Sequence, residues 1–217
     1  MEHTGSVTLK CPICKRDHSA ALYRRIDVSE DNKAKEKLLS GKFFHFSCPD
    51  CGYLSELHYG CLYVDRDIRL LIYLAEEKET EDAAERAAQD LPFWRQGDSL
   101  LRVVRSAKDL AEKLRIFDGG LDDRLVEICK GVALSQFPSD DAYYVTEIRY
   151  DVIGQQEVLR LTCSDGSEEY VPNFPFLYQQ IYDQFAAKLP PLRGSFFQCV
   201  DLEYAAALMR GFQEDAL

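Results

Sequence analysis

The sequence lacks the features that mark several large classes of protein. No apolar run comes near the roughly 18 residues that a membrane span needs, which excludes a spanning protein. Residues 1–10 have neither the apolar stretch nor the cleavage site of a signal peptide, so we expect a cytoplasmic location. The chain has no P-loop, no GxGxxG motif and no Ser-His-Asp order, so the common catalytic motifs are without support.

An excess of positive charge is also missing. The 217 residues carry a formal net charge of −11, and the imbalance lies in the later part of the chain. Residues 1–75 hold 11 Lys and Arg against 10 Asp and Glu, whereas residues 76–217 hold 15 against 27. This balance disfavours wrapping nucleic acid or lying on an anionic membrane, and it suits a basic protein partner or simple solubility.

Cysteine is the informative residue type. Four of the 8 cysteines form two CPxC motifs, Cys11-Pro12-Ile13-Cys14 and Cys48-Pro49-Asp50-Cys51. In a reducing compartment disulfides do not persist, and isolated cysteines are usually small core residues. This is the role that we expect for the four scattered cysteines, which are Cys61, Cys129, Cys163 and Cys199.

The two motifs have the spacing of a tetrahedral zinc site. Two residues between cysteines let a tight turn aim both sulfurs at one point, and Gly52 permits a positive φ after the second motif. A site closed by four thiolates leaves no open position for activating water. We therefore predict one structural zinc ion and no catalytic residue, with His18 as a weaker alternative ligand; the four ligands are Cys11, Cys14, Cys48 and Cys51.

The first third of the chain is typical of a β domain. Good strand formers and period-two alternation predict strands over residues 20–28, 42–47, 53–59, 62–64 and 68–75. A short charged helix is expected over residues 30–39, ended by Gly41. The acidic stretch 76–82 is the most plausible boundary, which gives a first domain over residues 1–75 and an α+β region over 76–217; whether the two pack as one unit is left open.

The later region changes to a helical period and then returns to strands. Helices are expected over residues 80–91 with Thr80 as N-cap, from 98–99 to 117, and from the N-cap Asp122 onward, which together make a helical middle over 80–135. A three-stranded meander follows over 143–171, and helices over 175–189 and 201–212 close the chain. The predicted fold class is α+β, with an N-terminal zinc ribbon-like β unit, a helical middle and a C-terminal antiparallel meander with helices.

These residues resemble the bacterial and archaeal CpXC family. The resemblance is carried by the two CPxC motifs with Gly41 ahead of the second, by 62–65 (LYVD) and by 112–124 (EKLRIFDGGLDDR), and it covers roughly residues 9–135. It maps the four cysteines onto the family's four ligands and implies a zinc-bearing domain, but it carries over no activity. Lys15 is a departure, because many such motifs have Gly at that position, and it is expected to alter the first turn slightly.

Two rival sites remain. The basic stretch 10–42 could bind nucleic acid, with Arg24 and Arg25 beside Tyr23, although a solvated surface is the commoner explanation. Acidic residues over 118–127 could hold a hard metal or act in catalysis, although Asp122 and Asp123 are better explained as helix caps; the group is Asp118, Asp122, Asp123 and Glu127. The leading hypothesis is a non-enzymatic zinc protein that acts through contacts with an unidentified protein partner.

Overall fold

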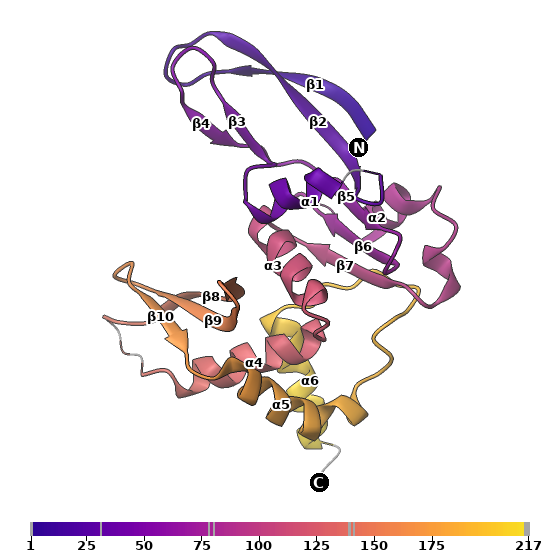
Figure 1. The fold of residues 1–217 in the computed structure, drawn as a ribbon, viewed down its shortest axis with the longest axis vertical. Coiled ribbons are helices and arrows are strands. Elements are labelled where there is room, and N and C mark those ends of the chain that lie inside the picture. The colour runs from indigo at the N-terminus through magenta and orange to yellow at the C-terminus, as the bar shows by residue number, and fades with distance from the viewer. Residues whose placement is uncertain are drawn as a thin grey trace. The chain divides into compact units, whose positions relative to one another are not determined.

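The computed structural model describes residues 2–30, 32–77, 79, 81–138, 140 and 142–214. In this part of the chain it is an α+β protein, with six α-helices and ten strands in three sheets (Figure 1). The residues cluster into two compact units, unit 1 (Met1–Ala111 with Arg193–Gln198) and unit 2 (Glu112–Leu192 with Cys199–Leu217). The acidic stretch 76–82 therefore lies inside unit 1. Among the described residues, no helix has the length and apolar character needed to cross a membrane.

Unit 1 is built on a five-stranded sheet in the order β1-β2-β5-β6-β7. β5 and β6 form the predicted antiparallel hairpin, whereas β2 pairs with β5, and β6 with β7, in parallel. Every residue of β5, β6 and β7 is buried, which explains why these strands are apolar apart from Asp65 in β5 and Arg102 in β7. The strands are β1 (Glu2–Lys10), β2 (Asp17–Asp27), β5 (Cys61–Asp65), β6 (Leu70–Leu74) and β7 (Leu100–Val104).

Two helices belong to unit 1 alone. α1 (Asn32–Leu39) ends ahead of Gly41, which has a φ of 70°, a backbone conformation that glycine adopts without strain. α2 (Glu81–Ala88) connects the parallel strands β6 and β7, and it buries Ala83, Ala84 and Ala88 in the same apolar cluster as the sheet. The predicted N-cap of this helix, Thr80, lies outside the described residues.

The helix expected from residues 98–99 to 117 is wrong in its first part. Residues 100–104 form β7, and the helix α3 (Ala107–Asp118) begins only after it. A fully buried strand has no alternation of polar and apolar residues, so its apolar run can imitate one face of a helix. The β-branched pair Val103 and Val104 favours the strand.

Unit 2 combines helices with the predicted meander. The three-stranded antiparallel sheet has the order β10-β9-β8, and it turns at Gly154 and Gly166, which have φ values of 66° and 82°. α4 packs against α5, α6 and β8. The remaining bounds are α4 (Asp123–Gln136), β8 (Val145–Ile153), β9 (Gln156–Cys163), β10 (Glu168–Val171), α5 (Phe174–Phe185) and α6 (Leu202–Glu214).

Half-buried tyrosines make both units sensitive to alkaline pH. Burial raises the pKa of Tyr59 in unit 1 and of Tyr178 in unit 2 to about 12. Because the folded pKa lies above the unfolded value of about 10, this stabilisation is complete below pH 10 and is lost as the pH rises towards 12. We expect the free energy of unfolding to fall there by up to about 1.4 kcal/mol per pH unit for each such tyrosine.

Urea unfolding at pH 9 and pH 11 measures this loss. Tyr59→Phe should make the decline between the two pH values smaller, whereas Tyr144→Phe, at a position that is 49% exposed, should leave it as in the wild type. An unchanged decline in the Tyr59 variant would contradict the role assigned to this phenol.

Candidate metal centre

The two CPxC motifs lie at the ends of two neighbouring hairpins. The first motif connects β1 to β2, and the second connects β3 (His45–Ser47) to β4 (Leu54–Glu56). Figure 1 shows both hairpins projecting side by side from the rest of unit 1. We call these projecting residues, 5–22 and 45–56, the cysteine arm. The strands predicted over 42–47 and 53–59 are therefore present but shorter.

Both motifs have the same backbone hydrogen bonds. The N–H of Lys15 donates to the carbonyl of Cys11 at 2.9 Å, and the N–H of Gly52 donates to the carbonyl of Cys48 at 2.9 Å. A second backbone hydrogen bond closes each turn, in which the first cysteine is the donor. The N–H of Cys11 donates to the carbonyl of Arg16, and the N–H of Cys48 donates to the carbonyl of Tyr53. The two motifs are thus the same tight turn built twice, which aims two pairs of sulfurs at one place.

The four sulfurs meet as the spacing predicts. Cys11 Sγ lies 3.5 Å from Cys51 Sγ, and Cys14 Sγ lies 3.6 Å from Cys48 Sγ. All four Sγ atoms lie within 4.8 Å of one another, and none of these cysteines is in a disulfide. Ligands at 2.3 Å around a tetrahedral ion would be about 3.8 Å apart. The cluster therefore has the size of a four-thiolate metal site, and it could bind a metal ion.

The electrostatics of the cluster favour a bound cation. Desolvation opposes ionisation of Cys11, but backbone hydrogen bonds from Cys14 and Ile13 outweigh it and lower the pKa of this thiol to about 6. A backbone hydrogen bond from Tyr53 lowers the pKa of Cys51, yet desolvation and the other sulfurs raise it to about 11. Thiols so close cannot all ionise unless a positive charge compensates them, and a divalent metal ion supplies that charge.

Lys15 adopts the glycine conformation that the first turn needs. Its φ is 62°, close to the 74° of Gly52 at the equivalent position of the second turn. The departure from the family pattern is thus accommodated by strain in one residue, and the backbone hydrogen bonds of the turn are kept. For a residue with a side chain, this conformation costs about 1–2 kcal/mol.

Removing the side chain at position 15 and adding one at position 52 should change the free energy of unfolding in opposite directions. We expect Lys15→Gly to stabilise the protein by about 0.5 kcal/mol, because relief of strain exceeds the added freedom of glycine in the unfolded chain. Gly52→Ala should destabilise it by about 1 kcal/mol. Urea unfolding measures both, and Gly131→Ala, in an open helical position of α4, is a control that should stabilise. Equal effects at Gly52 and Gly131 would contradict the account.

His18 lies beside the four sulfurs. Its Nε2 is 3.3 Å from Cys48 Sγ and 3.2 Å from Asp50 Oδ2, and Asp50 also accepts an ion pair from Arg16 at 3.1 Å. These contacts form a second group of side chains that could hold a metal ion, which consists of Cys14, His18, Cys48 and Asp50. With four cysteine sulfurs already converging, the imidazole is placed as an outer partner whose Nε2 lies within hydrogen-bonding distance of both the Cys48 sulfur and the Asp50 carboxylate.

Aromatic side chains fix the second hairpin against β2. The Tyr23 ring contacts Phe43 at 5.4 Å between centroids, Phe43 contacts Phe44 at 5.1 Å, and Phe44 contacts Tyr59 at 5.4 Å. Phe44 is almost fully buried. The Tyr23–Phe43 pair is tilted and the other two pairs are edge-to-face, and because such contacts are directional, this row holds the β3–β4 hairpin where its cysteines reach the first pair.

The acidic residues over 118–127 are placed differently from one another. Asp122 is the N-cap of α4 and accepts the N–H of Arg124 at 3.0 Å, which confirms the predicted cap, and the Arg124 guanidinium also binds its carboxylate at 2.6 Å. Asp123 lies in the first turn as expected, but its carboxylate is fully buried. Asp118 ends α3 at an exposed position. These carboxylates therefore do not converge on one point.

A buried charge network joins α3 to α4. Lys113 Nζ lies 3.1 Å from Asp123 and 3.2 Å from Glu127, and Lys130 Nζ lies 2.6 Å from Glu112 and 2.9 Å from Glu127. All five residues are at most 5% exposed. Arg149 also lies 3.1 Å from Glu112, so three cations balance the three carboxylates, which leaves little net negative charge to attract a hard metal ion.

Unit 1 contains a polar cleft that the sequence analysis did not predict. This cleft has a volume of about 960 Å³, and its lining includes Arg24, Arg25, Tyr73 and Glu79. Arg25 is held by Asp90 at 2.7 Å, and the Tyr73 hydroxyl donates to Glu79 at 3.0 Å. Long-range pairs such as Arg25 with Asp90 leave no pattern in one sequence, so the cleft was not predictable.

Comparison with known proteins agrees with the cysteine geometry. No curated protein matches this chain, and no solved structure matches it. Residues 9–130, more than half of the chain, match the family described as CpXC protein. The matched segment contains both motifs, the whole of the five-stranded sheet from β2 onward, α3 and about half of α4. The chain therefore belongs to the CpXC protein family.

Proposed function

We propose that this CpXC protein is a cytoplasmic zinc protein in which one ion stabilises the cysteine arm, and that it acts without catalysis through contacts with another protein. The observation that carries the proposal is the convergence of four sulfurs from two equivalent turns. Four sulfur ligands favour zinc over hard cations such as Mg²⁺ or Ca²⁺. With four protein ligands and no open position, a zinc ion here would supply folding energy and would not activate water.

Metal analysis tests the metal part of this proposal. Protein purified without added metal should contain one zinc ion per chain, and a strong chelator should lower its melting temperature. Cobalt bound in place of zinc should give the absorption of a tetrahedral thiolate complex. Purified protein with no stoichiometric metal, or a melting temperature insensitive to the chelator, would refute it.

The apolar surface of the arm supports a protein partner. Ile13 and Leu54 are 64% and 63% exposed, and Tyr53 between the motif and Leu54 is 38% exposed. Ile13 belongs to the first motif and Leu54 follows the second, so each exposed side chain lies within three residues of a cysteine of the cluster. The Arg16–Asp50 ion pair adds charged groups to the same two turns. An apolar centre with a charged rim is the usual composition of a protein interface.

A variant of the exposed side chains tests the interaction part. Ile13→Ser with Leu54→Ser should keep the zinc content and the melting temperature, because neither side chain is buried. A photo-crosslinker at position 13 of the otherwise wild-type chain should join a protein partner in the native cell, whereas one at position 144, exposed in unit 2, should not join the same partner. Equal crosslinking from both positions would contradict an interface at the arm.

The two rival functions have less support from the side-chain geometry. Several cations of the basic stretch are already paired with acids, as in Arg16 with Asp50, Arg25 with Asp90 and Lys35 with Asp65. Nucleic-acid binding through this stretch would fall steeply with salt concentration, and a titration with RNA and DNA tests it. An enzyme using residues 118–127 would need carboxylates that are open to substrate, and Asp123 and Glu127 are buried in ion pairs.

A further inference from the structure

β7 is the last strand of the five-stranded sheet, and a distant segment covers its free edge. The segment is Arg193–Gln198, which reaches unit 1 after α5 and leaves it before α6. It forms two isolated β-bridges, from Gly194 to Ser99 and from Gln198 to Arg102. We call this segment the strap. An uncovered edge strand is a template for pairing with another chain, so the strap occupies a place where an extended peptide can bind.

The strap is recognised largely through its backbone. Gly194 N–H donates to Ser99 at 2.9 Å, Gln198 N–H donates to Leu101 at 3.3 Å, and Val103 N–H donates to Gln198 at 2.9 Å. The Arg193 guanidinium adds bonds to the carbonyls of Ile68 at 3.0 Å and Asp98 at 2.9 Å. Bonds to main-chain groups make few demands on side chains, so other extended segments can satisfy them.

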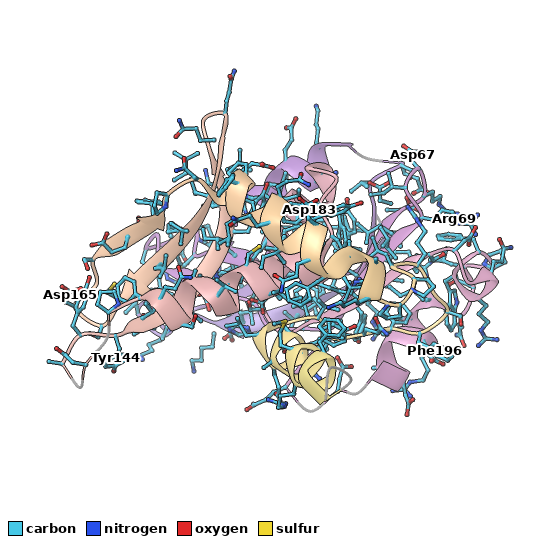
Figure 2. The ribbon with its side chains drawn as sticks, turned by 90° about the horizontal axis from the view of Figure 1, so that it is seen from below. Asp67, Arg69, Tyr144, Asp165, Asp183 and Phe196 are labelled. Carbon is cyan, nitrogen blue, oxygen red and sulfur yellow. The ribbon has the colours of Figure 1, made fainter. Side chains whose placement is uncertain are left out.

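One aromatic side chain supplies the specificity. Phe197 is 5% exposed and packs on Trp94 with ring centroids 5.8 Å apart, in the same buried cluster as Leu101 and Val103. The preceding residue, Phe196 (labelled in Figure 2), is 71% exposed. The alternation of an outward and an inward aromatic ring is that of an extended segment with one anchor in a pocket.

We infer that the β7 edge and the Trp94 pocket are a peptide-binding groove of unit 1, which the strap fills within the same chain and can vacate for an extended peptide with an aromatic anchor. In the described part of the chain, the strap has two main-chain bonds to β7, one to Ser99 just before β7, and one anchoring ring. It lies outside the segment 9–130 that matches the family. Its attachment to the chain keeps its local concentration high, so it competes with any peptide from solution. This inference is independent of the metal centre.

Tryptophan fluorescence tests the inference directly, because Trp94 is the single tryptophan of the chain. Phe197→Ala should shift the emission of Trp94 to longer wavelength and speed hydrogen exchange at the Val103 amide, while the zinc content stays unchanged. A synthetic peptide of residues 192–199 should then reverse the shift, with an affinity at least ~10-fold higher for this variant than for the wild type, in which the strap competes.

Two further variants keep the test decisive. Phe196→Ala removes an exposed ring of the same chemistry, and it should behave as the wild type in every measurement. Gly194→Pro removes the N–H that donates to Ser99 without opening a cavity, so it should also increase peptide binding if the Phe197 variant is too unstable to study. A peptide that binds neither opened variant, or binds equally when its residue 197 is Ala, would overturn the groove.

Discussion

Cys11→Ser and Cys48→Ser are expected to lose the metal ion and to unfold at least residues 1–75. Both residues are almost fully buried, and each belongs to a different turn, so either substitution opens the sulfur cluster from one side. Apparent zinc-binding free energies of about 10–16 kcal/mol are comparable with the whole stability of a domain, about 5–15 kcal/mol. Metal content and hydrogen exchange across β1 to β6 measure the two losses.

Cys199→Ser is the matched control for this prediction. It makes the same chemical change at a half-buried cysteine outside the cluster, where the Cys199 sulfur bonds Asp201 at 3.4 Å and a hydroxyl can replace it. We expect full metal content and a nearly unchanged melting temperature. If the Cys11 and Cys48 variants also kept their metal and their melting profile, the cluster would not stabilise this domain.

Lys113→Met is expected to destabilise the protein by about 3–5 kcal/mol. The substitution fits the space of the lysine stem, but it leaves the buried carboxylate of Asp123 without the ammonium group 3.1 Å away. Removing one partner of a buried ion pair is far more costly than removing an exposed charge, because the remaining charge has lost both water and its counter-ion. Urea unfolding gives the free energy change.

Two controls separate this effect from ordinary loss of a lysine. Lys108→Met makes the same change on an exposed face of α3 and should change stability by less than about 0.5 kcal/mol. Adding Asp123→Asn to Lys113→Met should recover part of the loss, since Glu127 keeps Lys130 at 2.9 Å. A loss at Lys113 no larger than at Lys108 would mean that the network is not energetically coupled.

The site could be read from the sequence because its geometry is local. Each CPxC motif determines its own turn, and the only long-range requirement is that two such turns meet, which the pairing of β1 with β2 and of β3 with β4 satisfies. The meander was equally readable, because Gly154 and Gly166 take the positive φ values that its turns require. Lys15 could not be predicted in the same way, because it adopts a positive φ of 62° at a position where the turn usually has glycine.

Features that depend on contacts between distant residues could not be predicted. β7 was mistaken for the start of a helix because burial on both faces removes the alternation that identifies a strand. The network around Lys113 and Lys130 was not predicted, because a sequence does not show which charges are taken out of water. Nothing in the local sequence around Phe197 indicates that its ring packs on Trp94.

The return of residues 193–198 to unit 1 determines how this protein can be divided for study. A shortened chain that stops after α4 keeps every residue of the family segment, yet it leaves Trp94 and the edge of β7 uncovered. Such a fragment would be prone to self-association, and its poor behaviour would be a result of the cut and not a property of the family domain. Replacing residues 137–192 by a flexible linker would not solve this, because it removes β8 and α5, against which α4 packs. The family domain is therefore best studied in the full chain.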